Sequence, residues 1–320
     1  MELYRPTHPI RFVTASSLFD GHDASINIMR RILQSQGAEV VHLGHNRSVD
    51  EVVTAAISED VQGVAISAYQ GGHVEYFSYL VELLRARGAG HIKVYGGGGG
   101  VIVREEIELL HSRGVARIFS PDDGLELGLP GMINTMIQAC DVDLAAQPVG
   151  SVDSLLSGDV QALARACTQL QAGVLPEDRL AAITDAARQR AVPVLGITGT
   201  GGSGKSSLTD ELIRRFRLDQ QDKLRIAVLA VDPTRRRGGG ALLGDRIRMN
   251  CLDGSGVFFR SLATRTWKGE VPEGLDESIL ACKAAGYDLV IVETPGIGQG
   301  DAGIVDHADF SLYVMTPEFG

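Results

Sequence analysis

One segment of the sequence has the spacing of a phosphate-binding loop. Residues 199–206 are Gly-Thr-Gly-Gly-Ser-Gly-Lys-Ser, which fits G-x-x-x-x-G-K-[ST] at every fixed position. Glycines in such a loop let successive main-chain N–H groups point at phosphate oxygens, and the following helix adds the positive end of its dipole. Lys205 is expected to reach the β- and γ-phosphates and Ser206 to ligate Mg²⁺. The predicted nucleotide-binding residues of the loop are Gly202, Ser203, Gly204, Lys205, Ser206 and Ser207.

Acidic residues that end two strand-like runs are expected to complete this phosphate site. Asp232 and Glu293 each follow directly after such a run. Ligands of parallel α/β sheets lie beyond the carboxyl ends of the strands, so both carboxylates are candidates for holding Mg²⁺ or its waters. Thr294 is predicted as a further magnesium ligand. The segment 293–296, Glu-Thr-Pro-Gly, has the form of a switch loop whose glycine senses the γ-phosphate.

A third charged segment, residues 244–248, is Gly-Asp-Arg-Ile-Arg. If it is helical, Asp245 and Arg248 share a face because they are three residues apart. One could then serve the metal and the other the phosphates, so Asp245 is predicted as a magnesium ligand and Arg248 as a nucleotide ligand. Lys205, Glu293 and Arg248 are predicted as the catalytic residues of nucleotide hydrolysis.

A histidine between two aspartates, Asp20-Gly21-His22-Asp23, lies between a strand-like run and an amphipathic helix. Such a connection ordinarily needs only a glycine and a helix cap. In a doubly wound sheet of order 2-1-3-4-5, the loops after strands one and three flank one crevice. Ser67 ends the third run and the glycine run 96–100 follows the fourth. The crevice would hold one imidazole, one acid and much exposed backbone.

The elements that must position these residues form two alternating β/α patterns. Continuous apolar runs, as expected of strands buried on both faces, occur first at 10–15, 38–43, 62–67, 91–95 and 115–119, with helix-like stretches between them. These five units predict a flavodoxin-like, Rossmann-like parallel sheet. Alternation resumes with runs at 194–198, 225–231, 257–259, 287–292 and 310–315. We expect an α/β domain at 1–140, a helical linker acting as a spacer at 141–190, and an incomplete P-loop domain at 191–320.

Composition narrows the class of protein. The net charge of −10 argues against a nonspecific nucleic-acid surface, which needs a basic face. Four widely separated cysteines form no metal-spaced pair and indicate reduced thiols. Neither a signal peptide nor an apolar run long enough to cross a membrane is present, so we expect a cytoplasmic protein without a membrane partner.

The second domain resembles the GTPase chaperones of methylmalonyl-CoA mutase. The resemblance rests on three motifs in order: Asp232-Pro233-Thr234, the segment 239–246 and the segment 293–299. In that family the acids matching Asp232, Asp245 and Glu293 gather around Mg²⁺, and the substrate is GTP. The guanine-reading motif of the family follows the next strand, and we expect this chain to end before it. A preference for guanine therefore comes from the resemblance alone.

Three interpretations of the His22 crevice compete. A signalling receiver needs a phosphoacceptor aspartate at the end of strand three, where this chain has Ser67. A flavin site needs aromatic walls and a phosphate loop after strand one, and leaves the histidine unexplained. Asp20-Gly21-His22, Ser67 and Gly97-Gly98 instead resemble motifs of cobalamin-dependent mutases.

That resemblance implies a role for each matching residue. His22 would ligate cobalt in place of the cofactor's own benzimidazole, and Asp20 would orient the imidazole. Ser67, Gly97 and Gly98 would contact the freed nucleotide tail. Two positions depart from the pattern: the family's glycine after the histidine is Ser25, and its leucine after the serine is Tyr69.

The two domains on one chain resemble the fused isobutyryl-CoA mutases, of which this would be the N-terminal portion. The resemblance implies adenosylcobalamin, GTP or GDP and Mg²⁺ as cofactors, and an intramolecular rearrangement of isobutyryl-CoA to n-butyryl-CoA. The acyl-CoA would bind a downstream region, and the chaperone domain would gate cofactor loading. We expect the full-length protein to be a homodimer. The alternative is a cobalamin carrier or sensor with a GTPase switch and no mutase activity.

Overall fold

The fold is described from a computed structural model of the 320-residue chain. The described residues are 3–148, 150–234, 240–243, 245–252, 256–265, 271–294, 303 and 306–317. They form two compact units, one of residues 1–143 with 235–244, the other of residues 144–234 with 245–320. Each unit is described by itself. No helix in the described ranges is long and apolar enough to cross a membrane.

Unit 1 is built on a parallel sheet with the strand order β5-β4-β3-β1-β2-β8. Its strands are β1 (Arg11–Ser17), β2 (Glu39–Arg47), β3 (Gly63–Ser67), β4 (Lys93–Gly97), β5 (Arg117–Phe119) and β8 (Ala241–Leu243). The first five strands follow the predicted flavodoxin-like order 2-1-3-4-5, which confirms the expected fold class. The carboxyl ends of β1 and β3 are therefore neighbours, with Ser16 paired to Ser67 in the register.

The sequence does not predict the sixth strand, β8. It is only three residues long, too short for a periodic apolar pattern, and pairs in parallel with β2 from Glu39↔Ala241 to Val41↔Leu243. Ala241 and Leu243 are fully buried in this position. Gly240 permits the approach, since a Cβ there would lie 2.2 Å from the carbonyl oxygen of Gln34.

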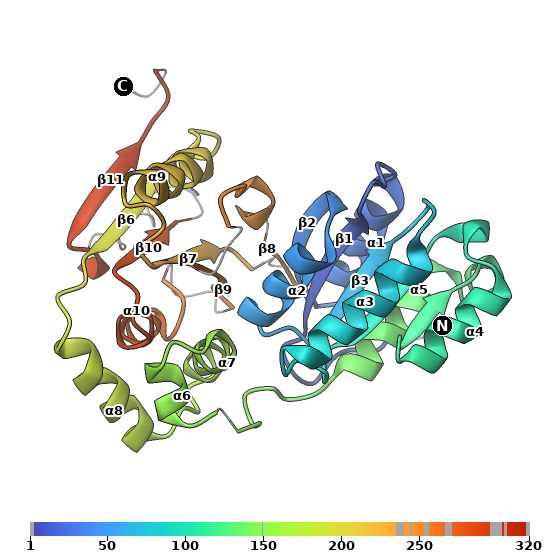
Figure 1. The fold of residues 1–320 in the computed structure, drawn as a ribbon, viewed down its shortest axis with the longest axis horizontal. Coiled ribbons are helices and arrows are strands. Elements are labelled where there is room, and N and C mark those ends of the chain that lie inside the picture. Colours follow the sequence, from blue (N-terminus) through green and yellow to red (C-terminus); the bar gives the residue numbers. More distant parts are fainter. Residues whose placement is uncertain are drawn as a thin grey trace. The chain divides into compact units, whose positions relative to one another are not determined.

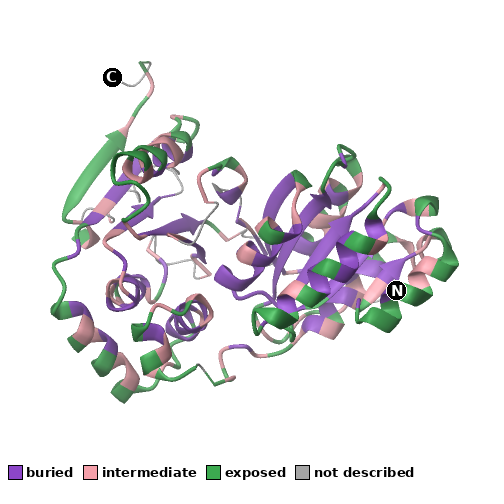
Figure 2. Ribbon diagram, viewed as in Figure 1, coloured by how far each residue is buried: buried purple, intermediate pink, exposed green. Residues whose placement is uncertain are grey.

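Helices cover both faces of the unit 1 sheet (Figure 1). They are α1 (Ala24–Ser35), α2 (Val49–Ser58), α3 (His73–Ala86), the short η1 (Gly99–Val101), α4 (Arg104–Arg113) and α5 (Pro121–Cys140). Helix α1 packs against α5 in one layer, while α3 packs between α2 and α4 in the other. Figure 2 shows the strands buried and the outward faces of the helices exposed. Helix α5 is interrupted at Gly128, where φ is +64°, two residues before Pro130.

Unit 2 has a parallel sheet of order β11-β6-β10-β7-β9. Its strands are β6 (Val194–Gly199), β7 (Ile226–Asp232), β9 (Val257–Ala263), β10 (Leu289–Glu293) and β11 (Phe310–Val314). Its helices are α6 (Val152–Leu156), α7 (Val160–Gln171), α8 (Glu177–Arg188), α9 (Lys205–Asp219), η2 (Asp245–Arg248) and α10 (Leu275–Ala284). Strand β10 lies between β6 and β7. The phosphate loop after β6, Glu293 at the end of β10 and Asp232 at the end of β7 therefore belong to three adjacent strands.

The stretch expected to be a helical linker is helical and packs within unit 2. Leu163 and Cys167 of α7, both fully buried, share one apolar cluster with Leu229 of β7 and Phe258 of β9. Helix α10 packs against both α7 and α8. These helices are therefore a layer of the unit 2 core in addition to connecting the two units along the chain.

A buried histidine in unit 1 predicts a loss of stability in acid. His42 on β2 is 5% exposed, and its Nδ1 lies 2.9 Å from Oγ1 of Thr14. Burial, with the positive charge of Arg30, lowers the pKa of His42 from 6.5 to about 4. The unfolded chain therefore takes up a proton first as pH falls, and the stability present above 6.5 is lost between 6.5 and about 4.

We expect this group to reduce the free energy of unfolding by about 2 kcal/mol between about pH 7 and pH 5. His42→Gln keeps a polar partner for Thr14 and should remove that part of the pH dependence. His45→Gln is the matched control, because His45 is exposed on the same strand. The measurement is urea unfolding followed by circular dichroism at both pH values. An identical pH dependence in wild type and His42→Gln would contradict the prediction.

Candidate functional site

His22 and Asp20 form a hydrogen-bonded pair in the loop between β1 and α1. Nδ1 of His22 lies 2.8 Å from Oδ1 of Asp20, which also accepts the main-chain N–H of His22 at 2.8 Å. The other oxygen, Oδ2, accepts the main-chain N–H of Tyr69 at 2.6 Å. Asp20 is completely buried. Its carboxylate thus ties the loop after β1 to the loop after β3.

The ring of His22 has one nitrogen engaged by Asp20. A carboxylate only accepts hydrogen bonds, so Nδ1 is the donor, and in the neutral imidazole Nε2 is the nitrogen with the lone pair. The His22 side chain is 63% exposed, and Nε2 has no hydrogen-bond partner among the described residues. An exposed, oriented imidazole with a carboxylate behind it is an arrangement that suits a metal ligand.

Ser67 lies beside this loop, where strands β1 and β3 end. Its Oγ is 2.8 Å from Oγ of Ser16, and Ser16 also donates to the carbonyl oxygen of His22 at 3.4 Å. Both serines are buried. Ser16 was not among the predicted site residues. The parallel register places it opposite Ser67, so the neighbouring strand order would have been enough to find it.

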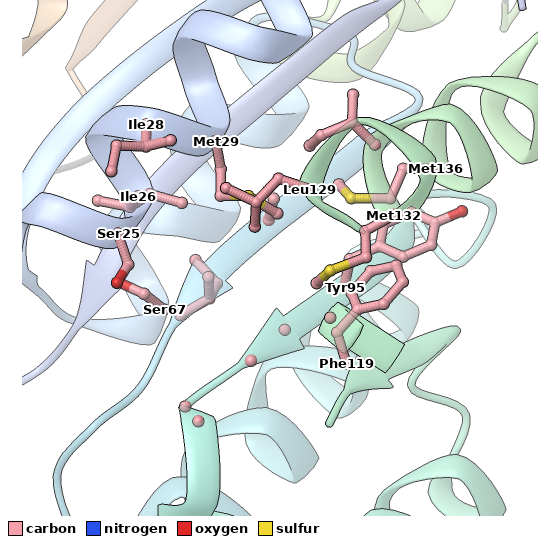
Figure 3. A pocket seen from close by; sticks show the side chains of 18 of the residues that line it. Ser25, Ile26, Ile28, Met29, Ser67, Tyr95, Phe119, Leu129, Met132 and Met136 are labelled. Carbon is pink, nitrogen blue, oxygen red and sulfur yellow. The ribbon is translucent and has the colours of Figure 1, made fainter. Parts of the chain in front are cut away.

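A cavity of about 240 Å³ opens on this face of the sheet, and Ser67, Gly97 and Gly98 all line it. Figure 3 shows Ser25 and Ser67 on one side of the cavity and Met132, Met136, Phe119 and Tyr95 on the other. The second side is uncharged. Tyr95 Oη lies 3.7 Å from Sγ of Cys140, and burial raises the pKa of the Tyr95 hydroxyl. One side of the cavity thus carries the hydroxyls of Ser25 and Ser67 beside the apolar Ile26 and Ile28, and the other side is mainly apolar.

Two of the glycines that line the cavity, Gly97 and Gly98, differ in whether the surrounding backbone leaves room for a side chain. A Cβ at Gly98 would lie 2.0 Å from the carbonyl oxygen of Ala68, so the fold itself requires glycine there. At Gly97 the nearest atom, the carbonyl oxygen of Phe119, would be 3.4 Å away, an ordinary contact. The described structure has room for alanine at 97. Of these two glycines, only Gly98 is thus required by the backbone around it.

The predicted phosphate loop joins β6 to α9 in unit 2. Gly202 and Gly204 have φ of +78° and +91°, in the left-handed region that favours glycine. Helix α9 begins at Lys205, whose buried ammonium donates to the carbonyl oxygens of Gly199 and Thr200, each at 3.0 Å. Ser203 is half-buried and Ser207 is exposed in the first turn of α9. The loop has the strand–loop–helix context that its motif requires.

Glu293 ends β10 and contacts two hydroxyls of α9. Its Oε1 accepts from Ser206 at 2.6 Å, and its Oε2 lies 2.9 Å from Oγ1 of Thr209. Thr209 is also 3.0 Å from the carbonyl oxygen of Lys205, so its single proton can serve only one of the two acceptors. Glu293 and Thr209 are almost completely buried. The structure thus brings Glu293 and Ser206 together as expected of two groups serving one metal.

Thr209 is a member of this cluster that the sequence analysis did not identify. It lies three residues after Ser206 on the same helix, so the two hydroxyls share a face. That spacing was the available signal. Asp232 ends the neighbouring strand β7 and is also buried. Register pairs Glu293 with Ala230, which puts Asp232 two residues farther along the same edge of the sheet.

The remaining predicted nucleotide ligands are less completely described. The hydroxyl of Thr294 donates to Oγ1 of Thr198 at 3.0 Å, which engages it with β6. Asp245 and Arg248 lie on η2, a short 3₁₀ helix. Arg248 is exposed there, and the side chain of Asp245 lies outside the described residues. The expected switch segment continues at 295–300, which also lies outside the described residues.

Sequence comparisons assign a family to each half of the chain. Residues 10–124 match the B12 binding domain family, and residues 163–320 match the family "Methylmalonyl Co-A mutase-associated GTPase MeaB". The first match covers His22 and most of the cavity lining but ends before Met132 and Met136, and the second covers the phosphate loop and Glu293.

Longer relatives match both halves at once. Proteins named fused isobutyryl-CoA mutase are 71% identical over 99% of this chain in Nocardia farcinica and 64% identical over 98% in Cupriavidus metallidurans. The chain is therefore similar, over almost its whole length, to proteins named fused isobutyryl-CoA mutase. It spans 29% of the length of each of these two relatives. A third protein with this name, from Geobacillus kaustophilus, is 59% identical over 99% of the chain. The chain spans 30% of the length of that protein.

Proposed function

We propose that this chain is the cobalamin- and nucleotide-binding part of an adenosylcobalamin-dependent mutase that converts isobutyryl-CoA to n-butyryl-CoA. The acyl-CoA would be bound by a part of the protein outside these 320 residues. When bound, adenosylcobalamin supplies a cobalt–carbon bond whose homolysis starts the rearrangement. The roles in binding cobalamin and nucleotide would belong to residues of this chain.

The observation that carries the proposal is the hydrogen-bonded Asp20–His22 pair in the loop after β1, where Asp20 also accepts the main-chain N–H of Tyr69, a residue that lines the cavity. With Nδ1 of His22 hydrogen-bonded to Asp20 at 2.8 Å, Nε2 of the neutral imidazole would be the donor atom for a metal. Imidazole nitrogen is a suitable donor for first-row transition metals such as cobalt. Asp20 would fix the ring's orientation and raise its basicity. In this role His22 would ligate the cobalt.

The cavity fits the nucleotide tail of a cobalamin whose own base has left the cobalt. Ser67 and Gly97 would face the polar sugar–phosphate part of the tail, and the apolar side with Met132 and Met136 would receive the benzimidazole. Methionine side chains adapt to irregular aromatic shapes. Gly98 lines the same space but is already required by the backbone of Ala68.

The unit 2 site is proposed to bind and hydrolyse GTP with Mg²⁺. Lys205 would transfer its two hydrogen bonds from the loop carbonyls to the β- and γ-phosphates. Ser206 would ligate Mg²⁺, with Glu293, Asp232, Asp245 and Thr294 as the other candidates for the metal or its waters. Arg248 would neutralise phosphate charge, and the nucleotide state would gate the loading of cobalamin at His22.

A conversion assay tests the mutase activity. The full-length protein, loaded with adenosylcobalamin, is expected to form n-butyryl-CoA from isobutyryl-CoA, because the oriented imidazole and the tail cavity together hold the cofactor in place. Product is measured by chromatography of the acyl-CoA thioesters. Protein without cofactor and the His22→Ala variant are the controls, and both should form no product above background.

The same assay separates the mutase from the alternative class. A protein that binds cobalamin tightly but converts neither isobutyryl-CoA nor n-butyryl-CoA would be a carrier or sensor with a GTPase switch. That outcome would contradict the proposed reaction while leaving His22 as the cobalt ligand.

A further inference from the structure

The two positions that depart from the cobalamin-mutase pattern contact each other. Oγ of Ser25, in the first turn of α1, lies 2.9 Å from the hydroxyl of Tyr69, in the loop after β3. Glycine and leucine at these positions could form no such bond. Both side chains are half-buried and line the cavity. The pair links α1 to the loop after β3.

Tyr69 touches both members of the proposed cobalt-binding pair. Its main-chain N–H donates to Oδ2 of Asp20 at 2.6 Å. Its ring centroid is 5.7 Å from that of His22, with the two rings tilted by 49°. Ser25 therefore holds the far end of a side chain whose ring lies against the imidazole. Without this contact, the exposed His22 ring would be restrained only by its hydrogen bond to Asp20.

Rotational freedom of the His22 ring in the unbound protein would weaken its binding to a metal. A side chain that is 63% exposed must lose rotational freedom when it ligates a metal, and this loss weakens binding. A neighbouring ring that already limits the rotation reduces the loss, which is the general benefit of preorganisation.

We propose that Tyr69, fixed by its hydrogen bond to Ser25, is a positioning residue that orients His22 as a ligand for cobalt. The proposal rests on the proposed function of His22 and adds a third group to the Asp20–His22 pair. It also explains the two departures together, because the hydroxyl at 25 is useful only with a hydroxyl at 69. Ser25 and Tyr69 act as one unit through His22 and are not catalytic residues.

The test uses cob(II)inamide, a corrinoid without the nucleotide tail or its base, and the full-length protein. A nitrogen on the cobalt must then come from the protein, and it splits the cobalt lines in the paramagnetic resonance spectrum. Tyr69→Phe and Ser25→Ala should each lower the nitrogen-coordinated fraction and weaken corrinoid affinity by about fivefold, the usual worth of one hydrogen bond. The double variant should lose no more than either single variant, because both remove the same bond.

Two controls separate positioning from a general structural effect. Ser25→Thr keeps the hydroxyl and should keep the wild-type spectrum and affinity. Tyr79→Phe removes the hydroxyl of an exposed tyrosine on α3 and should change neither. Circular dichroism of each variant is expected to match that of wild type.

Two results would overturn the proposal: wild-type spectra and affinity in both single variants, or losses that multiply in the double variant. A wild-type protein that shows no nitrogen splitting would instead contradict the proposed ligand and the positioning role together. Failure of the positioning role alone is thus visible only in the variants, and failure of the proposed function is visible in wild type.

Discussion

Replacement of His22 with alanine is expected to abolish nitrogen coordination of the cobalt and to weaken cobalamin affinity by more than about 100-fold. Loss of a residue that merely supports a metal ligand costs about 10- to 100-fold, so loss of the ligand itself should cost more. The structure leaves no substitute: Asp20 is buried and its two oxygens already accept three hydrogen bonds from main-chain and imidazole N–H groups. Affinity is measured by titration of the cofactor's absorption spectrum in the full-length protein.

The matched control for this experiment is His45→Ala. His45 is exposed near the carboxyl end of β2, on the strand next to β1, so its removal is an equivalent surface change. It should leave spectrum and affinity unchanged. Nitrogen coordination that persists in His22→Ala would show that another residue ligates the cobalt, and the assignment of His22 would then be wrong.

The sequence alone was sufficient for the parts of the fold that have local signals. Each strand of the unit 1 sheet from β1 to β5 contains or overlaps a short, largely apolar run, and the phosphate loop is a contiguous motif between a strand and a helix. The order of the strands then follows from general rules for doubly wound sheets. Those rules also place His22 and Ser67 at one edge before any coordinate is known.

The features that were missed depend on contacts between distant segments. Strand β8 has three residues, and only its pairing with β2 makes it a strand. The helices of 141–190 were recognised as helices, but the sequence does not say that Cys167 packs against strands 60 or more residues away. Ser25 and Tyr69 are 44 residues apart, so no local pattern joins them. Departures from a family motif would be better examined in pairs than one at a time.

Lys205→Ala is expected to lower the rate of GTP hydrolysis by at least about 100-fold in the full-length protein. A single charged donor at the developing phosphate charge contributes about this much to catalysis. Lys205 is buried and already aimed at the loop, where it donates to the carbonyl oxygens of Gly199 and Thr200. Lys223→Ala is the matched control, because Lys223 is an exposed lysine in the same unit and should leave the rate unchanged. Phosphate release is the measurement, and a rate close to that of wild type would contradict the assigned role.

The same variant tests whether nucleotide gates cobalamin loading. If it does, the wild-type protein should bind cobalamin with different affinities in GDP, in a nonhydrolysable GTP analogue and without nucleotide. Coupling between two binding sites is reciprocal, so cobalamin must change nucleotide affinity by the same factor. Lys205→Ala should remove these differences, because it removes the contact that distinguishes the γ-phosphate, while Lys223→Ala should keep them. Equal cobalamin affinities and release rates in all three wild-type conditions would mean that the His22 and Lys205 sites work independently, since chain connectivity alone couples nothing.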